Sequence, residues 1–94
     1  MDIYTVELSP RAKKDLRGLP IHIIDKLESW VRAIERVGLR EVQRTPGYHD
    51  EPLKGNRLGQ RSVRLNKAYR AIYILKKGME VEFLRVEEVN KHEY

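Results

Sequence analysis

The sequence contains no cysteine, and this absence excludes a disulfide framework, a thiolate metal site and a cysteine nucleophile. It also contains no apolar run that approaches the roughly 18 residues needed to span a membrane. The N-terminal residues carry an acid at Asp2 and no apolar stretch long enough for a secretion signal. We therefore expect a cytoplasmic protein that has no membrane partner.

Several common catalytic sites are also missing. No cluster of Asp and Glu accompanies the most basic segment, so a two-metal nuclease site is not indicated. The three histidines lack metal-ligand spacing, and no Gly-rich loop matches a nucleotide-binding fingerprint. Ser62 has no histidine beside it in the sequence that would activate it as a nucleophile. We therefore expect neither a bound metal nor another cofactor.

Positive charge is concentrated in one segment of the chain. The 94 residues include 19 Lys and Arg and 14 Asp and Glu, for a formal net charge of +5. Eight of the basic residues fall between Leu53 and Lys77, where there is no Asp or Glu, whereas residues 80–94 contain five Glu. Because folded surfaces usually interleave the two signs, this segment predicts a polyanionic partner. A solvated strand face is the alternative interpretation.

The length and the apolar fraction of 40% predict one globular domain that spans residues 1–94. Residues Ile3–Leu8 are rich in β-branched and aromatic side chains, which is typical of a strand. Ser9 followed by Pro10 is a helix start, with a hydroxyl at the N-cap and proline at the first helical position. The short helix that follows presents one apolar stripe of Ala12, Leu16 and Leu19.

A second helix is predicted from Ile21 to Val37, and Gly38 is well placed to end it. Its apolar residues recur at helical spacing: Ile23, Leu27, Trp30, Ile34 and Val37. From Leu39 to Asn56 the periodicity is lost, and turn-forming residues such as those of Thr45–Gly47 predict a connecting loop.

Three strands are predicted in the rest of the chain: Gln60–Leu65, Ala68–Leu75 and Val81–Val89. Asn66-Lys67 is typical of a tight hairpin turn between the first two. The strand Ala68–Leu75 is apolar on both faces, which favours a central position in the sheet. In the last strand the apolar residues change from one face to the other near Leu84, and a β-bulge there would explain the change.

The element order therefore predicts an α+β fold of the form β-α-α-β-β-β. The N-terminal strand and a two-helix hairpin accompany a small, mainly antiparallel sheet of four strands, and the helices cover one face. The other face stays open, and Arg64 and Arg70 can project onto it. An ion pair of Arg70 with Glu82 or Glu87 on the neighbouring strand is the alternative for that residue.

The basic segment and the C-terminal residues supply arginine, lysine, tyrosine and a late histidine. This inventory fits metal-free cleavage of RNA, in which the ribose 2′-hydroxyl attacks the neighbouring phosphate. The reaction needs a base for that hydroxyl, an acid for the departing 5′ oxygen and cations for the pentacoordinate phosphate. Arginine suits the last task because its planar fork matches phosphate oxygens and keeps its charge. Histidine, with a free pKa of about 6.5, can serve as acid or base.

The segment LKGNRLGQRSVRLNKAYRAIY, followed by a strand and the tail EVNKHEY, resembles the RelE/ParE toxin superfamily of bacterial toxin–antitoxin systems. The similarity is greatest to the RelE- and HigB-like ribosome-dependent mRNA interferases, and it covers essentially the whole chain. It implies the RelE-like microbial ribonuclease fold. It also implies an endoribonuclease toxin that cleaves mRNA in the ribosomal A site and so inhibits translation.

The resemblance also implies roles for individual residues. Lys54 would contact phosphate or act in catalysis, and Arg70 would stabilise the transition-state phosphate. Arg64 would hold the RNA backbone or replace a catalytic lysine found in some relatives. At the C-terminus, Lys91 would supply a cation, His92 the general acid or base, and Tyr94 a stacking or proton-transfer group. Three further cations are expected to bind RNA: Arg57, Arg61 and Lys67. His49 lies near the position of a functional histidine in certain HigB-like toxins, at a different spacing from Lys54.

Two other functions are compatible with the sequence. A ParE-like toxin would bind DNA gyrase without phosphoryl chemistry, and it shares the same scaffold. A non-catalytic RNA-binding module would show salt-sensitive binding without cleavage products. The resemblance further implies an antitoxin partner in a hetero-oligomer, most simply an acidic amphipathic helix that covers the sheet or the helices. An exposed tail is the alternative interpretation of His92.

Overall fold

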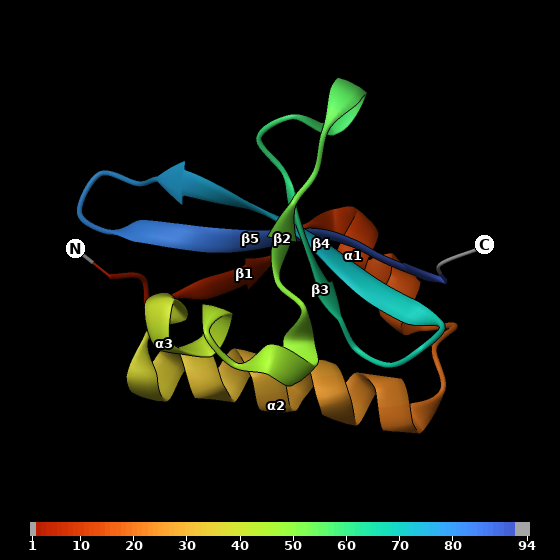
Figure 1. The fold of residues 1–94 in the computed structure, drawn as a ribbon. Coiled ribbons are helices and arrows are strands. Elements are labelled where there is room, and N and C mark those ends of the chain that lie inside the picture. The colour runs from red at the N-terminus through yellow and green to blue at the C-terminus, as the bar shows by residue number, and fades with distance from the viewer. Residues whose placement is uncertain (1, 92–94) are drawn as a thin grey trace.

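The computed structural model describes residues 2–91, which form a five-stranded sheet with helices on one face and at one edge (Figure 1). The strands are β1 Val6–Leu8, β2 Glu51–Pro52, β3 Arg61–Arg64, β4 Tyr69–Lys77 and β5 Glu82–Lys91. The helices are α1 Pro10–Leu16, α2 Ile21–Val37 and α3 Leu39–Gln43, with short 3₁₀ turns η1 Pro46–Tyr48 and η2 Gly55–Arg57.

The strand order in the sheet is β1-β5-β4-β3-β2, with β4 in the centre as the sequence predicts. The pairs β2–β3, β3–β4 and β4–β5 are antiparallel, whereas β1 runs parallel to β5. The α+β class, the mainly antiparallel sheet and the open face are thus confirmed. The predicted count of four strands is wrong by one, because β2 also joins the sheet.

Helix α1 begins where the capping pattern places it. Ser9 has extended backbone angles, and its hydroxyl accepts a hydrogen bond from the Ala12 N–H at 3.0 Å. The helix lies along the C-terminal half of β5, where Asp15 accepts a hydrogen bond from the Val89 N–H at 3.0 Å. This contact satisfies a backbone group at the edge of the sheet, beyond the end of β1.

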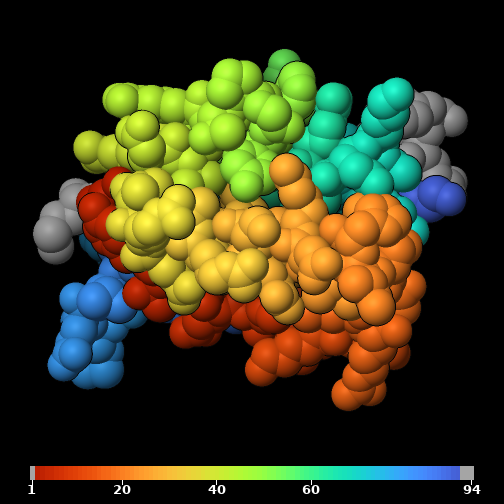
Figure 2. Space-filling view, turned by 90° about the horizontal axis from the view of Figure 1, so that it is seen from below, coloured from red at the N-terminus to blue at the C-terminus, as the bar shows by residue number. Residues whose placement is uncertain are grey.

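Helix α2 has the predicted bounds and lies across one face of the sheet (Figure 1), and it occupies the middle of the surface seen from below (Figure 2). Its buried residues are Ile23, Leu27, Trp30 and Ile34, four of the five predicted from the helical spacing; Val37 is exposed. They pack with inward-facing side chains of the sheet such as Val63, Tyr73 and Val86. No helix among residues 2–91 is long and apolar enough to cross a membrane.

The segment Leu39–Asn56, predicted to be a loop, contains α3, η1, β2 and the start of η2. Each of these elements is five residues or shorter, so none is long enough to show a periodic apolar pattern. Strand β2 consists of Glu51 and Pro52, which pair with Ser62 and Arg61. A two-residue edge strand containing proline gives no strand signal, which explains why the fifth strand is not evident in the sequence.

The predicted bulge is present, but it lies three residues after Leu84. Ile72 pairs with Glu88 and the adjacent Tyr73 pairs with Val86, which leaves Glu87 without a residue opposite it. This extra residue lets both Val86 and Val89 enter the core on the same side of the sheet.

Candidate nucleic-acid site

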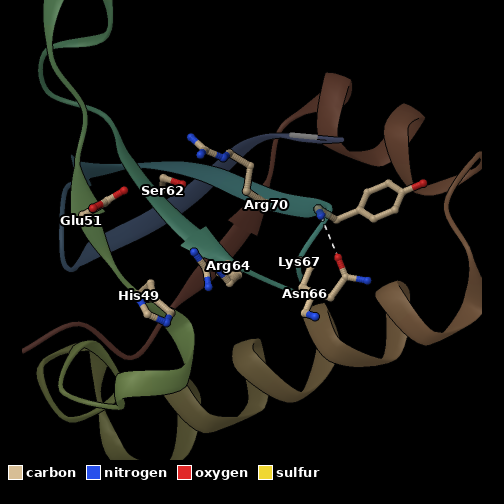
Figure 3. Close-up of a pocket in the computed structure, with 8 residues that line it drawn as sticks. His49, Glu51, Ser62, Arg64, Asn66, Lys67 and Arg70 are labelled. Atoms are coloured by element: carbon tan, nitrogen blue, oxygen red, sulfur yellow. Dashed lines mark hydrogen bonds between the residues drawn. The ribbon is translucent and has the colours of Figure 1, made fainter. Parts of the chain in front are cut away.

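The open face carries a pocket of about 200 Å³ at the β3–β4 hairpin (Figure 3). Its lining is polar and includes three Lys and Arg side chains against one carboxylate: His49, Glu51, Ser62, Arg64, Asn66, Lys67, Tyr69 and Arg70. Small-molecule sites usually measure about 300–1,000 Å³, so this pocket suits a phosphodiester group better than a complete nucleotide.

Arg64 and Arg70 lie directly opposite each other across the β3–β4 pair. Cross-strand partners have Cβ atoms about 4.5–5.5 Å apart, and like charges at such positions destabilise a sheet. Because both residues also line the pocket, the arrangement suits an anion that would offset the repulsion between their charges. Of the cations predicted from the sequence, Arg64, Lys67 and Arg70 are thus brought together.

The hairpin turn sets this pairing. The Asn66 side chain accepts hydrogen bonds from the Ala68 N–H at 2.7 Å and the Tyr69 N–H at 2.8 Å. Such side-chain caps are the reason asparagine favours turns. The connection is longer than the two-residue turn predicted from Asn66-Lys67, because the strands end at Arg64 and resume at Tyr69. Lys67 sits at the tip and reaches the pocket from there.

His49 and Glu51 bring an imidazole and a carboxylate into the same pocket. The resemblance to HigB-like toxins points to His49, whereas nothing in the sequence points to Glu51. His49 points toward Arg64, and Glu51 lies beside Ser62 on the neighbouring strand (Figure 3). They come from the aperiodic segment before β3, where sequence spacing carries no information on which side chains meet. The His49 backbone has left-handed angles, φ 45° and ψ 50°, which redirect the chain into β2.

The remaining predicted cations lie outside the pocket lining. Lys54 is exposed in the segment that projects from the sheet between β2 and β3 (Figure 1). Arg57 interacts with Glu88 at 3.2 Å and with Gln60 at 2.9 Å. Arg61 lies on the helical side, where its Nε donates to Asp50 at 2.7 Å. Partial burial lowers the pKa of Arg61, but the hydrogen bond and charge of Asp50 outweigh this effect and raise the pKa overall.

The C-terminal candidates are only partly described. Lys91 ends β5 and pairs with Tyr69, the residue before Arg70, so β5 leads the chain toward the pocket end of the hairpin. His92 and Tyr94 lie outside the described residues. Arg70 is opposite Asn90, and Glu87, one of the two carboxylates considered as its partner, interacts with Arg85 at 3.3 Å.

The pocket combines cationic side chains with a carboxylate and an imidazole. Cations of this kind suit phosphate oxygens, and the Glu51 carboxylate and the His49 imidazole are of the residue types used in general acid–base catalysis. Among residues 2–91 no group of three or more His, Asp or Glu is arranged to hold a metal ion.

Solved structures share this architecture over nearly their whole length. A YoeB/ParE toxin from Agrobacterium tumefaciens matches with a TM-score of 0.67 and 20% identity, covering 95% of this chain and 99% of that chain. A chain of the RelBE2 toxin–antitoxin complex from Mycobacterium tuberculosis matches with a TM-score of 0.68 and 22% identity, covering 96% of this chain and 99% of that chain. A chain of the DinJ–YafQ complex from E. coli matches with a TM-score of 0.62 and 21% identity, covering 93% of this chain and 91% of that chain. No family model and no curated protein matches the sequence.

The chain has the RelE/ParE toxin fold. The resemblance seen in the basic segment and the tail is thereby confirmed at the level of the fold. Within the RelE/ParE fold, the open face of the sheet carries the opposed arginines, and the segment before β3 carries the acid–base groups. Because this scaffold is compatible with more than one activity, the function depends on the chemistry of the pocket and not on the fold alone.

Proposed function

We propose that this protein is the toxin of a type II toxin–antitoxin system and a metal-independent endoribonuclease that cleaves mRNA in the ribosomal A site. The observation that carries the proposal is the convergence of Arg64, Lys67 and Arg70 with Glu51 and His49 in one pocket on the open face. A gyrase-binding toxin would not require two opposed arginines beside groups that exchange protons.

In the proposed reaction the scissile phosphate lies between the guanidinium groups of Arg64 and Arg70. Glu51 accepts the proton of the ribose 2′-hydroxyl, because its carboxylate is the acidic side chain in the lining of the same pocket. The 2′ oxygen then attacks the phosphorus and the bond to the 5′ oxygen breaks. The two arginines stabilise the additional negative charge of the pentacoordinate phosphate.

The departing 5′ oxygen takes its proton from an imidazole. His49 is in the pocket, and His92 is the candidate from the sequence. The pocket is small and open, so it does not by itself align an RNA strand for attack. We propose that the ribosome supplies this alignment, since correct placement can contribute as much to the rate as side-chain chemistry.

The proposed partner in the resting state is an antitoxin. The RelBE2 and DinJ–YafQ structures are complexes of a toxin with an antitoxin, and both share this fold. An acidic segment of the partner would offset the excess of arginine and lysine around the pocket, and the two chains would form a hetero-oligomer.

The test is a brief induction of the protein in bacterial cells, followed by mapping of new 5′ ends on translated and untranslated messages. Wild type should cut translated messages, and Arg70→Gln and Glu51→Gln should abolish the cuts. His49→Gln and His92→Gln, tested separately, identify the general acid. Arg36→Gln, which changes an exposed arginine on α2, is the matched control and should cut like wild type.

The other functions predict different results. Growth arrest with DNA damage and intact messages would replace the nuclease with a gyrase-directed toxin. Salt-sensitive RNA binding without new ends would indicate a non-catalytic RNA-binding module.

A further inference from the structure

Asp50 lies between His49 and Glu51 in the sequence, but its side chain is on the opposite side of the sheet. The carboxylate is almost fully buried, with a side-chain exposure of 1%. One oxygen accepts a hydrogen bond from Arg61 Nε at 2.7 Å, and the other accepts from the Tyr73 hydroxyl at 2.6 Å. Short bonds to an ionised carboxylate are among the stronger hydrogen bonds in proteins.

Tyr73 connects this carboxylate to the core. Its side chain is fully buried, its ring centroid lies 5.5 Å from that of Trp30, and its hydroxyl accepts a hydrogen bond from Gln43 Nε2 at 3.1 Å. Burial, followed by the hydrogen bond to Asp50, raises the pKa of Tyr73. The phenol therefore stays protonated and remains a donor to Asp50.

The segment that carries the acid–base groups is held by alternate residues. Tyr48 packs against the core, and the Lys26 Nζ lies over its ring, 5.0 Å from the ring centroid. Asp50 is held by its hydrogen bonds with Arg61 and Tyr73. His49 and Glu51 are the residues that reach the pocket. The left-handed backbone of His49 is a conformation that persists only where the surroundings impose it.

We propose that Asp50, Tyr73 and Arg61 are positioning residues that fix His49 and Glu51 beside the phosphate site. None of the three lines the pocket, so they act through the backbone of residues 49–51. The inference rests on the proposed function, because the groups it positions are those that exchange protons with RNA. Beyond the proposed function, the inference assigns an influence on the cleavage rate to a buried hydrogen-bond network on the side of the sheet opposite the pocket.

The test measures single-turnover cleavage of a message bound to bacterial ribosomes, with the protein in increasing excess. Tyr73→Phe keeps the ring packed on Trp30 and removes the donor to Asp50. The rate at saturation should fall about 10-fold, since a displacement of about 1 Å can cost up to about 100-fold. The protein concentration at half saturation should stay within about twofold, because Arg64 and Arg70 bind the phosphate.

A merely structural role would not lower the saturated rate, because an excess of protein compensates for an unfolded fraction. Ile34→Val, which removes one methyl group from a buried side chain of α2 outside the hydrogen-bond network, is the stability control and should keep the wild-type saturated rate. Tyr4→Phe, at an exposed tyrosine, is the control for the loss of a hydroxyl. If Tyr73→Phe does not fold, Arg61→Gln removes the other donor to Asp50, and the same fall is expected.

Two outcomes would overturn the inference. If wild type cuts the message and both Tyr73→Phe and Arg61→Gln keep its saturated rate, the network does not position the pocket, and the proposed nuclease stands without it. If wild type does not cut messages on ribosomes at all, the proposed function is wrong and the positioning role falls with it.

Discussion

Arg64 and Arg70 occupy directly opposite positions on β3 and β4, so two like charges meet at one place on the open face of the sheet. Their side chains line the same pocket as Glu51 and His49. Like charges at directly opposite positions of two strands repel each other, and a bound anion would offset this repulsion.

Removing one of the two charges should stabilise the free protein. We expect Arg64→Gln to raise the free energy of unfolding by about 0.2–1 kcal/mol, the range for cross-strand charge pairs. The measurement is urea denaturation at low salt without RNA. Arg36→Gln, on α2 outside the sheet, should show no comparable gain. A clear loss of stability in Arg64→Gln would show that this guanidinium supports the fold instead.

The same substitution should weaken the electrostatic binding of RNA. The affinity for a single-stranded RNA with methylated 2′-hydroxyls should fall with salt, with a slope of about −0.7 per phosphate contact on logarithmic axes. Arg64→Gln and Arg70→Gln should each make that slope shallower by about 0.7. Arg61→Gln should leave it unchanged, because Arg61 faces Asp50 on the helical side. An unchanged slope in Arg64→Gln would remove this residue from the phosphate site.

Alkaline pH should selectively weaken the network around Asp50. The folded protein raises the pKa of Tyr73 through burial and the hydrogen bond to Asp50. In the unfolded chain the tyrosine loses its proton near pH 10, so its contribution is complete below that pH and is lost as the pH rises further. The stability difference between wild type and Tyr73→Phe should therefore narrow above about pH 10, by up to about 1.4 kcal/mol per pH unit.

Urea denaturation of both proteins between about pH 8 and pH 11 measures this difference, and lysines and other tyrosines titrate alike in the two. A difference that stays constant across this range would mean that the Tyr73 hydroxyl has the same pKa in the folded and unfolded protein.

Gly38 should not tolerate a side chain. It follows α2 with φ 89° and ψ 157°, a backbone region that is almost restricted to glycine. A Cβ there would also overlap the Asp2 carboxylate and lie 3.1 Å from the Tyr4 ring. Gly38→Ala should lower the free energy of unfolding by about 1–3 kcal/mol in urea denaturation. Gly47→Ala, where no atom lies within 4 Å of the new Cβ, is the control; equal losses in the two variants would contradict this account.

The parts of the fold that follow strong periodic patterns were predictable. Helix α2 has its predicted bounds, and Ser9 caps α1 as the sequence indicates. The alternation in β3 and β4 placed Arg64 and Arg70 on the face opposite Val63 and Tyr73, because a strand alternates strictly between faces. The opposed arginines of the pocket could therefore be found from the sequence.

The other half of the pocket could not be found in this way. His49, which follows a 3₁₀ turn, has a left-handed backbone, and Glu51 comes two residues later. Both reach the pocket through tertiary contacts of Asp50 and Tyr73. The alternation of side chains along β3 also predicts the direction of Arg61, one of the cations expected to bind RNA. Arg61 lies two residues before the buried Val63, so the same alternation that exposes Arg64 directs Arg61 toward the helices.

The chemistry of the cut tests the central claim most directly. The protein should be incubated with ribosomes carrying a message in which the nucleotide 5′ to the cut has either its 2′-hydroxyl or a hydrogen. The account predicts 5′-hydroxyl products from the first message and none from the second, because the 2′ oxygen is the nucleophile. Equal cleavage of both messages, or products with 5′-phosphate ends, would contradict it.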